Sequence, residues 1–140
     1  MEKIYIDCNI IIDWLTDREP FSFYADELFS LIESDQIEGC VSPLVLANTY
    51  YLLTKHFNKK VAFEFLKDCQ KLFTIFDLSK DITIEAINRK YKDFEDDLHY
   101  YVAIKNKIKY IITRNKIDFK IEKIKILTAE EYLTHYKNMI

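Results

Sequence analysis

Close to its N-terminus the chain reads Lys3-Ile4-Tyr5-Ile6-Asp7-Cys8-Asn9-Ile10-Ile11-Ile12-Asp13. The apolar run that ends at Ile6 predicts a buried strand, and a helix is expected to begin directly after Asp7. An ionised carboxylate at the rim of an apolar core must be neutralised, hydrogen-bonded or bound to a cation. Ligands collect at the carboxyl ends of strands in parallel α/β sheets, so Asp7 is the first candidate for a functional residue.

The bulk properties of the chain predict one globular domain over residues 1–140. Hydrophobic residues make up 49% of the 140 residues, with ten Phe and ten Tyr, which excludes a disordered chain. No apolar run approaches the roughly 20 residues of a membrane helix, and the first residues do not resemble a signal peptide. The three cysteines are scattered, which favours buried free thiols over disulfides or a zinc site. We therefore expect a cytoplasmic protein without a membrane segment.

Strand and helix patterns alternate along the chain. The strand patterns cover residues 3–7, 39–42, 74–78, 110–112 and 124–127. The helix patterns follow Pro20, cover 43–56 and 60–73, start near 81, cover 94–106, and begin again at the capping-box string 128–131. The alternation predicts an α/β fold with a mainly parallel central sheet that is covered on both faces.

Carboxylates recur at two further places where a parallel sheet would gather them. Asp93-Phe94-Glu95-Asp96-Asp97 opens a predicted helix, and Asp118 follows the strand 110–112. Acids in a first helical turn also serve as caps and favour the helix dipole, and Asp118 alone would be an ordinary loop acid. Brought together, Asp7, Asp96 and Asp118 would repel one another unless they were protonated or bound to Mg²⁺ or Mn²⁺. Such a cation site is typical of metal-dependent nucleases.

The charge distribution is uneven. The net charge is −3, which argues against a broad nucleic-acid surface, yet residues 105–125 carry eight basic side chains and two acids. This segment could hold a nucleic-acid backbone or could be a solvated lysine-rich face.

Four strings resemble the motifs of the PIN domain family and occur in the order of that family. They are Ile4-Tyr5-Ile6-Asp7-Cys8-Asn9, Ser42-Pro43-Leu44-Val45-Leu46-Ala47-Asn48, Asp93-Phe94-Glu95-Asp96-Asp97-Leu98 and Ile112-Thr113-Arg114-Asn115-Lys116-Ile117-Asp118-Phe119. The likeness runs from the first strand to the last helix. The chain resembles in particular the VapC-like bacterial PIN proteins, stand-alone domains that are often encoded as toxins beside a small antitoxin.

The resemblance implies a PIN-like three-layer α/β/α sandwich and Mg²⁺- or Mn²⁺-dependent hydrolysis of RNA by an endoribonuclease. Asp7, Asp96 and Asp118 would be the catalytic and metal-binding residues. Asp96 is preferred to Asp97, which stands where the family usually has a small residue. The implied partners are an RNA substrate, a cognate antitoxin and a second copy of the chain.

The resemblance also assigns supporting polar residues, and two of these depart from the family pattern. Asn9 and Thr113 match polar positions, whereas Asn48 and Asn115 stand where many PIN nucleases carry acids. An amide keeps an oxygen ligand but loses a charge, so metal affinity should fall. The alternative to a nuclease is therefore a PIN-fold module with a degraded site, which binds RNA or a protein without cutting.

The basic side chains expected to contact the RNA are Arg114, Lys116 and Lys120. A DNA-directed, structure-specific nuclease is the third option for the function, although the short chain lacks the additional elements that such enzymes tend to have.

Overall fold

The structure is a computed structural model, and it describes residues 1–89, 93–114 and 123–140. Its five strands form one sheet in the order β3-β2-β1-β4-β5, and every pairing is parallel. The strands are β1 (Glu2–Ile6), β2 (Ile37–Val41), β3 (Thr74–Ile75), β4 (Tyr110–Ile112) and β5 (Lys125–Leu127). The predicted parallel sheet is confirmed.

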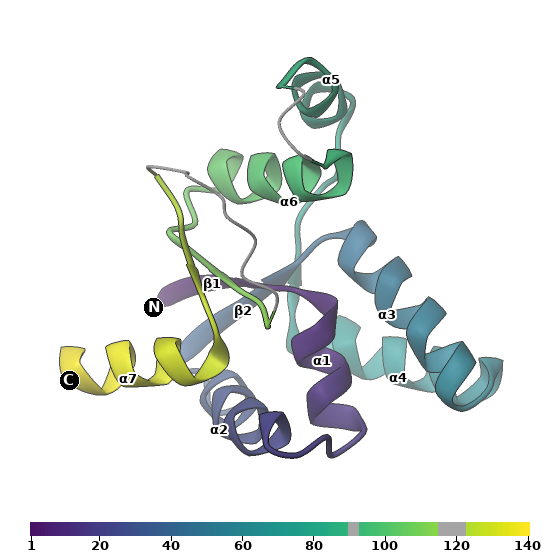
Figure 1. The fold of residues 1–140 in the computed structure, drawn as a ribbon, viewed down its shortest axis with the longest axis vertical. Helices are drawn as coiled ribbons and strands as arrows, with labels where there is room; N and C mark the ends of the chain where they lie inside the picture. The colour runs from purple at the N-terminus through teal and green to yellow at the C-terminus, as the bar shows by residue number, and fades with distance from the viewer. Residues whose placement is uncertain (90–92, 115–122) are drawn as a thin grey trace.

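Helices cover both faces of this sheet. They are α1 (Cys8–Leu15), α2 (Phe21–Glu33), α3 (Pro43–His56), α4 (Lys59–Leu72), α5 (Lys80–Arg89), α6 (Phe94–Lys105) and α7 (Ala129–Met139). In Figure 1, α2 and α7 lie on one face, α6 lies on the opposite face with α5 outside it, and α1 and α3 lie beyond the end of β1. The three-layer α/β/α architecture is confirmed. None of the described helices is long and apolar enough to cross a membrane.

The central strand β1 is buried on both sides. Ile4, Tyr5 and Ile6 have no exposed surface, because the strand is flanked by β2 and β4 and covered by helices above and below. This explains why the strand reads as a continuous apolar run rather than as an alternating one. Trp14 of α1 stacks on Phe29 of α2 with ring centroids 4.3 Å apart, so it packs these two helices together.

The only glycine of the chain, Gly39, lies in β2 where the side chains of Ile32, Phe73 and Ile6 crowd the backbone. A Cβ atom there would lie 2.8 Å from Cδ1 of Ile32 and 3.0 Å from Cδ1 of Phe73. Both distances are shorter than an ordinary carbon–carbon contact. A glycine therefore allows α2 and the chain around Phe73 to pack closely against the sheet.

The buried face of α6 is not the one that helical spacing alone would suggest. Phe94, Leu98, Tyr101, Val102 and Lys105 recur along α6 at helical spacing. Leu98 and Val102 are buried, but Phe94 is 50% exposed and Lys105 is exposed. The buried side also includes Asp97 and His99, because their polar groups meet Arg89 and Tyr5 inside the fold.

Candidate functional site

Asp7 lies at the point where the strand order of the sheet reverses. The chain proceeds from β1 toward β2 and β3 on one side and toward β4 and β5 on the other, so the exits of β1 and β4 lie at the topological switch point where open α/β sheets bind ligands. The backbone N–H of Asp7 donates to the carbonyl of Ile112 at 3.0 Å, which continues the β1–β4 ladder by one residue. Its carboxylate also caps α1, since Oδ1 accepts the backbone N–H of Cys8 at 2.7 Å.

The second carboxylate oxygen of Asp7 is held by residues from two strand exits. Thr113 Oγ1 donates to Asp7 Oδ2 at 2.8 Å, and Asn9 Nδ2 donates to Thr113 Oγ1 at 3.2 Å. The side-chain oxygen Oδ1 of Asn9 in turn accepts the backbone N–H of Arg114 at 3.1 Å. The structure thus brings three predicted site residues, Asp7, Asn9 and Thr113, into one hydrogen-bonded group that fixes the direction of the Asp7 carboxylate.

The first turn of α6 directs its acids to different places. Asp93 caps the helix, and its Oδ1 accepts the backbone N–H of Asp96 at 3.1 Å. Asp97 is buried and pairs with Arg89 at 3.2 Å. Burial raises the pKa of Asp96 to about 6, and the negative charges of Asp93, Glu95 and Asp7 add to this rise, while His99 opposes it. Asp96 therefore lies within the electrostatic reach of Asp7, whereas Asp97 is committed to Arg89.

A second polar group lies beside these acids; it contains the predicted residue Asn48, whereas the roles of Glu95 and His99 in it were not predicted. Asn48 Nδ2 donates to Glu95 Oε1 at 2.6 Å, and His99 Nε2 lies 3.7 Å from the same oxygen. On the other side of its ring, His99 Nδ1 lies 2.6 Å from the buried hydroxyl of Tyr5, which is also 2.8 Å from Ser42 Oγ. The four-residue spacing of Glu95 and His99 is the sequence signal that could have indicated a pair on one helical face.

This polar group shifts the ionisation of its members. The interaction with His99 lowers the pKa of Glu95, burial opposes the change, and the hydrogen bond from Asn48 lowers it further. Burial raises the pKa of Tyr5, so its hydroxyl keeps its proton. Burial and the charge of Asp7 raise the pKa of Cys8 to about 12, so the Cys8 thiol is no nucleophile at neutral pH.

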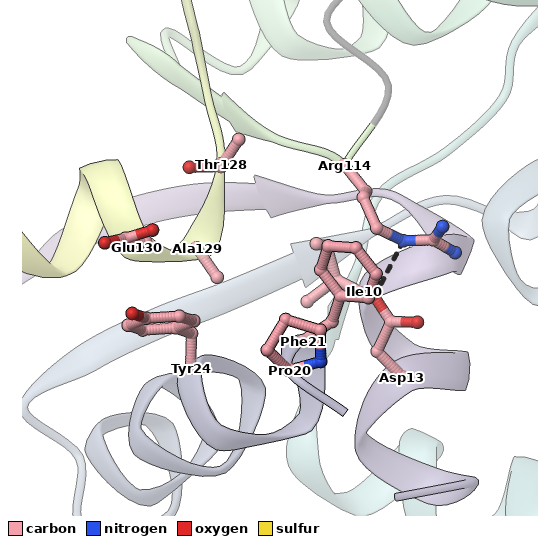
Figure 2. Close-up of a pocket in the computed structure, with 9 residues that line it drawn as sticks. All are labelled: Ile10, Asp13, Pro20, Phe21, Tyr24, Arg114, Thr128, Ala129 and Glu130. Atoms are coloured by element: carbon pink, nitrogen blue, oxygen red, sulfur yellow. Dashed lines mark hydrogen bonds and ion pairs between the residues drawn. The ribbon is translucent and has the colours of Figure 1, made fainter. Parts of the chain in front are cut away.

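The side chain of Arg114 binds the carboxylate of Asp13. Its Nε donates to Asp13 Oδ2 at 2.9 Å, and its guanidinium lies 4.8 Å from the centre of the Phe21 ring. Asp13 is only 1% exposed, so its carboxylate forms this ion pair inside the fold. Figure 2 shows this pair at one end of a cavity of about 180 Å³, with Phe21 and Tyr24 along its side. The predicted contact of Arg114 with RNA stays a prediction.

The donor set suits a hard divalent cation. Asp7 and Asp96 offer carboxylate oxygens of the kind that such a cation prefers, and burial, with a smaller contribution from the charge of Asp7, raises the pKa of Asp96. Within the described residues, no three His, Cys, Asp or Glu side chains gather closely enough to hold a metal ion by themselves. The remaining predicted site residues, Asn115, Lys116, Asp118 and Lys120, lie outside the described residues.

Fold and site together define a parallel α/β domain with carboxylates at its topological switch point. A family model described as "PIN domain" matches residues 3–117. The chain belongs to the PIN domain family, as its motifs predicted.

Comparison with individual proteins agrees with this assignment. The chain is 27% identical over 143 residues to "Ribonuclease VapC1" of Aquifex aeolicus (strain VF5), a match that covers 99% of this chain and 98% of that protein. Among solved structures, DNA-bound VapBC from Salmonella typhimurium has a TM-score of 0.68 at 18% identity, covering 92% of this chain and 99% of that one. A toxin–antitoxin complex from Klebsiella pneumoniae has a TM-score of 0.67 at 21% identity, covering 90% and 97%.

Proposed function

We propose that this protein is a divalent-cation-dependent endoribonuclease and the toxin of a toxin–antitoxin pair. The observation that carries the proposal is the Asp7 carboxylate at the switch point, oriented by Thr113 and within the electrostatic reach of Asp96. The similarity to a ribonuclease over nearly the full length of both chains supports the same reading. The structural likeness to chains from toxin–antitoxin complexes supports an antitoxin and a second copy of this chain as partners.

The residues of the proposed site have three roles, which are cation binding, orientation of Asp7 and contact with the RNA. Asp7 and Asp96 would hold Mg²⁺ or Mn²⁺, with Asp118 as the third proposed ligand. Bound there, such a cation supplies a polarised water and stabilises charge on a phosphodiester under in-line attack. Thr113 and Asn9 keep the Asp7 carboxylate in one orientation, so it needs no rearrangement when the cation binds. Lys116 and Lys120 would contact the RNA backbone.

Cleavage of RNA by the purified protein tests the proposal. Cutting should require Mg²⁺ or Mn²⁺, stop on addition of a chelator, and disappear in Asp7→Asn while that variant keeps the wild-type circular-dichroism spectrum. Cleavage by Asp7→Asn at the wild-type rate would remove Asp7 from the site. Absence of both cation binding and cleavage in the wild type would overturn the enzyme assignment.

The second candidate is a PIN-fold module that binds RNA or a protein without cutting. Asn48 favours it, because its amide contributes no charge at the position where many PIN nucleases carry an acid. This function predicts RNA binding that falls steeply with salt and weakens when Lys116 or Lys120 is replaced, with the RNA left intact. Branched DNA as a parallel substrate tests the DNA-directed option.

A further inference from the structure

We propose that Glu95, held by Asn48 and His99, supplies the site with an additional negative charge that acts on the cation from beyond its direct ligands. The inference rests on the proposed cation-dependent function and deepens it, because it assigns a positioning role to a side chain outside the Asp7, Asp96 and Asp118 set. It also assigns a role to the uncharged Asn48, whose amide holds the Glu95 carboxylate by a hydrogen bond.

The contacts of Glu95 are unequal at its two oxygens. Asn48 at 2.6 Å and His99 at 3.7 Å both address Oε1. Among the described residues no hydrogen bond is made to Oε2, although the side chain is only about half exposed. One oxygen is thus used to hold the carboxylate, and the other is left to accept a hydrogen bond from a water bound to a cation.

The support for Glu95 extends into the core. His99 Nε2 faces Glu95 Oε1 at 3.7 Å, which is longer than a hydrogen bond, and this contact is favourable when Nε2 carries a proton. In the neutral ring Nδ1 then accepts from Tyr5, whose hydroxyl lies 2.6 Å away, and Tyr5 accepts from Ser42 at 2.8 Å. Tyr5 belongs to the central strand two residues before Asp7, so both carboxylates are positioned from the same strand.

The position of Glu95 suits an indirect role. Its charge reaches Asp96, Cys8 and Tyr5, which are the side chains that also feel the charge of Asp7. Yet the described acids do not gather closely enough for three of them to hold a metal ion directly. Glu95 would therefore act on the cation through a water bound to it and through the local electrostatic potential, which agrees with both observations.

Manganese binding to the full-length protein, measured by calorimetry and by electron paramagnetic resonance of free Mn²⁺, tests the inference. Glu95→Gln keeps the size of the side chain and removes its charge, and we expect Mn²⁺ affinity to fall about five- to tenfold. The double variant Asn48→Glu with Glu95→Gln exchanges the amide and the carboxylate of the Asn48–Glu95 hydrogen bond. This variant should regain most of the Mn²⁺ affinity. Glu85→Gln is the charge-matched control, since Glu85 pairs with Lys105 on the outer face of α6.

The outcomes separate the inference from the function on which it rests. If the wild type binds no Mn²⁺ and cuts no RNA, the proposed function fails and the inference fails with it. If the wild type binds and cuts, and Glu95→Gln binds Mn²⁺ as tightly as the wild type, only the inference is overturned. A folded double variant that regains no affinity also overturns it, because the charge would then not act through this position.

Discussion

Thr113 Oγ1 donates a hydrogen bond to Asp7 Oδ2 at 2.8 Å, which joins two residues 106 positions apart in the sequence. The contact exists because β1 and β4 are neighbours in the sheet and end side by side. A carboxylate that follows a strand is free to rotate. A hydroxyl from the neighbouring strand exit removes that freedom at Asp7, and several consequences of this arrangement can be measured.

The first prediction concerns the Thr113 hydroxyl. Thr113→Val removes the donor but keeps the shape, and we expect RNA cleavage to fall about tenfold, as for loss of one hydrogen bond to a charged group. Thr113→Ser retains the hydroxyl and should stay within about threefold of the wild type, because the same bond can form. Single-turnover cleavage rates at saturating Mn²⁺ measure both. Equal rates for the Val and Ser variants would show that the orientation of Asp7 does not limit the reaction.

The second prediction concerns the pH dependence of the metal-free protein. The pKa of Asp96 is raised to about 6 in the folded state, so the folded protein binds the proton more tightly than the unfolded chain does. The stability linked to this group is therefore present at low pH and is lost as the pH rises from the unfolded pKa toward about 6. Asp96→Asn should match the wild type near pH 4 and exceed it above pH 6. Urea unfolding in the presence of EDTA at both pH values measures the difference, and an advantage that does not change with pH would contradict the prediction.

The third prediction concerns the ion pair of Asp13 and Arg114. Arg114→Ala leaves a nearly inaccessible carboxylate without its partner, and the free energy of unfolding should fall by about 3 kcal/mol. The double variant Asp13→Leu with Arg114→Met removes both charges and should be destabilised less. Urea titrations of the three proteins measure this. If instead Arg114→Ala keeps the wild-type stability and only weakens RNA binding, the side chain serves the RNA contact that the sequence suggested.

The fourth prediction concerns Gly39. Gly39→Ala places a methyl group against Ile32 and Phe73, and overpacking of this kind costs about 1–3 kcal/mol. Ile32→Val removes the Cδ1 atom that lies 2.8 Å from the added Cβ, so the double variant should lose less stability than the two single changes predict together. Thermal unfolding curves of the four proteins test this, and simple additivity of the two changes would rule out the proposed clash.

Much of the fold was predictable because its signals are local. The apolar run of β1, the proline at the start of α3 and the capping box of Thr128 and Glu131 each determine a boundary within a few residues. Hydrophobic runs and helix caps act over short distances in the sequence, so one chain suffices to find them.

The site was predictable only in part because its contacts are not local. Asp7 was identified from the end of a strand, and Asn9 and Thr113 from motif similarity. Glu95 and Asp13 were missed because their roles depend on Asn48 and Arg114, which are 47 and 101 residues away. From the sequence alone, an acid in the first turn of a helix such as Glu95 is interpreted as favouring the helix dipole. Only the tertiary structure shows that Glu95 contacts Asn48.

The parallel order of the sheet has a consequence for the newly made protein. A ribosome adds Thr113 to the chain 106 residues after Asp7. Until β4 enters the sheet beside β1, the Asp7 carboxylate lacks its orienting hydroxyl from Thr113. If the protein is a ribonuclease toxin, a growing chain that still lacks β4 also lacks the assembled Asp7–Thr113 part of the proposed site.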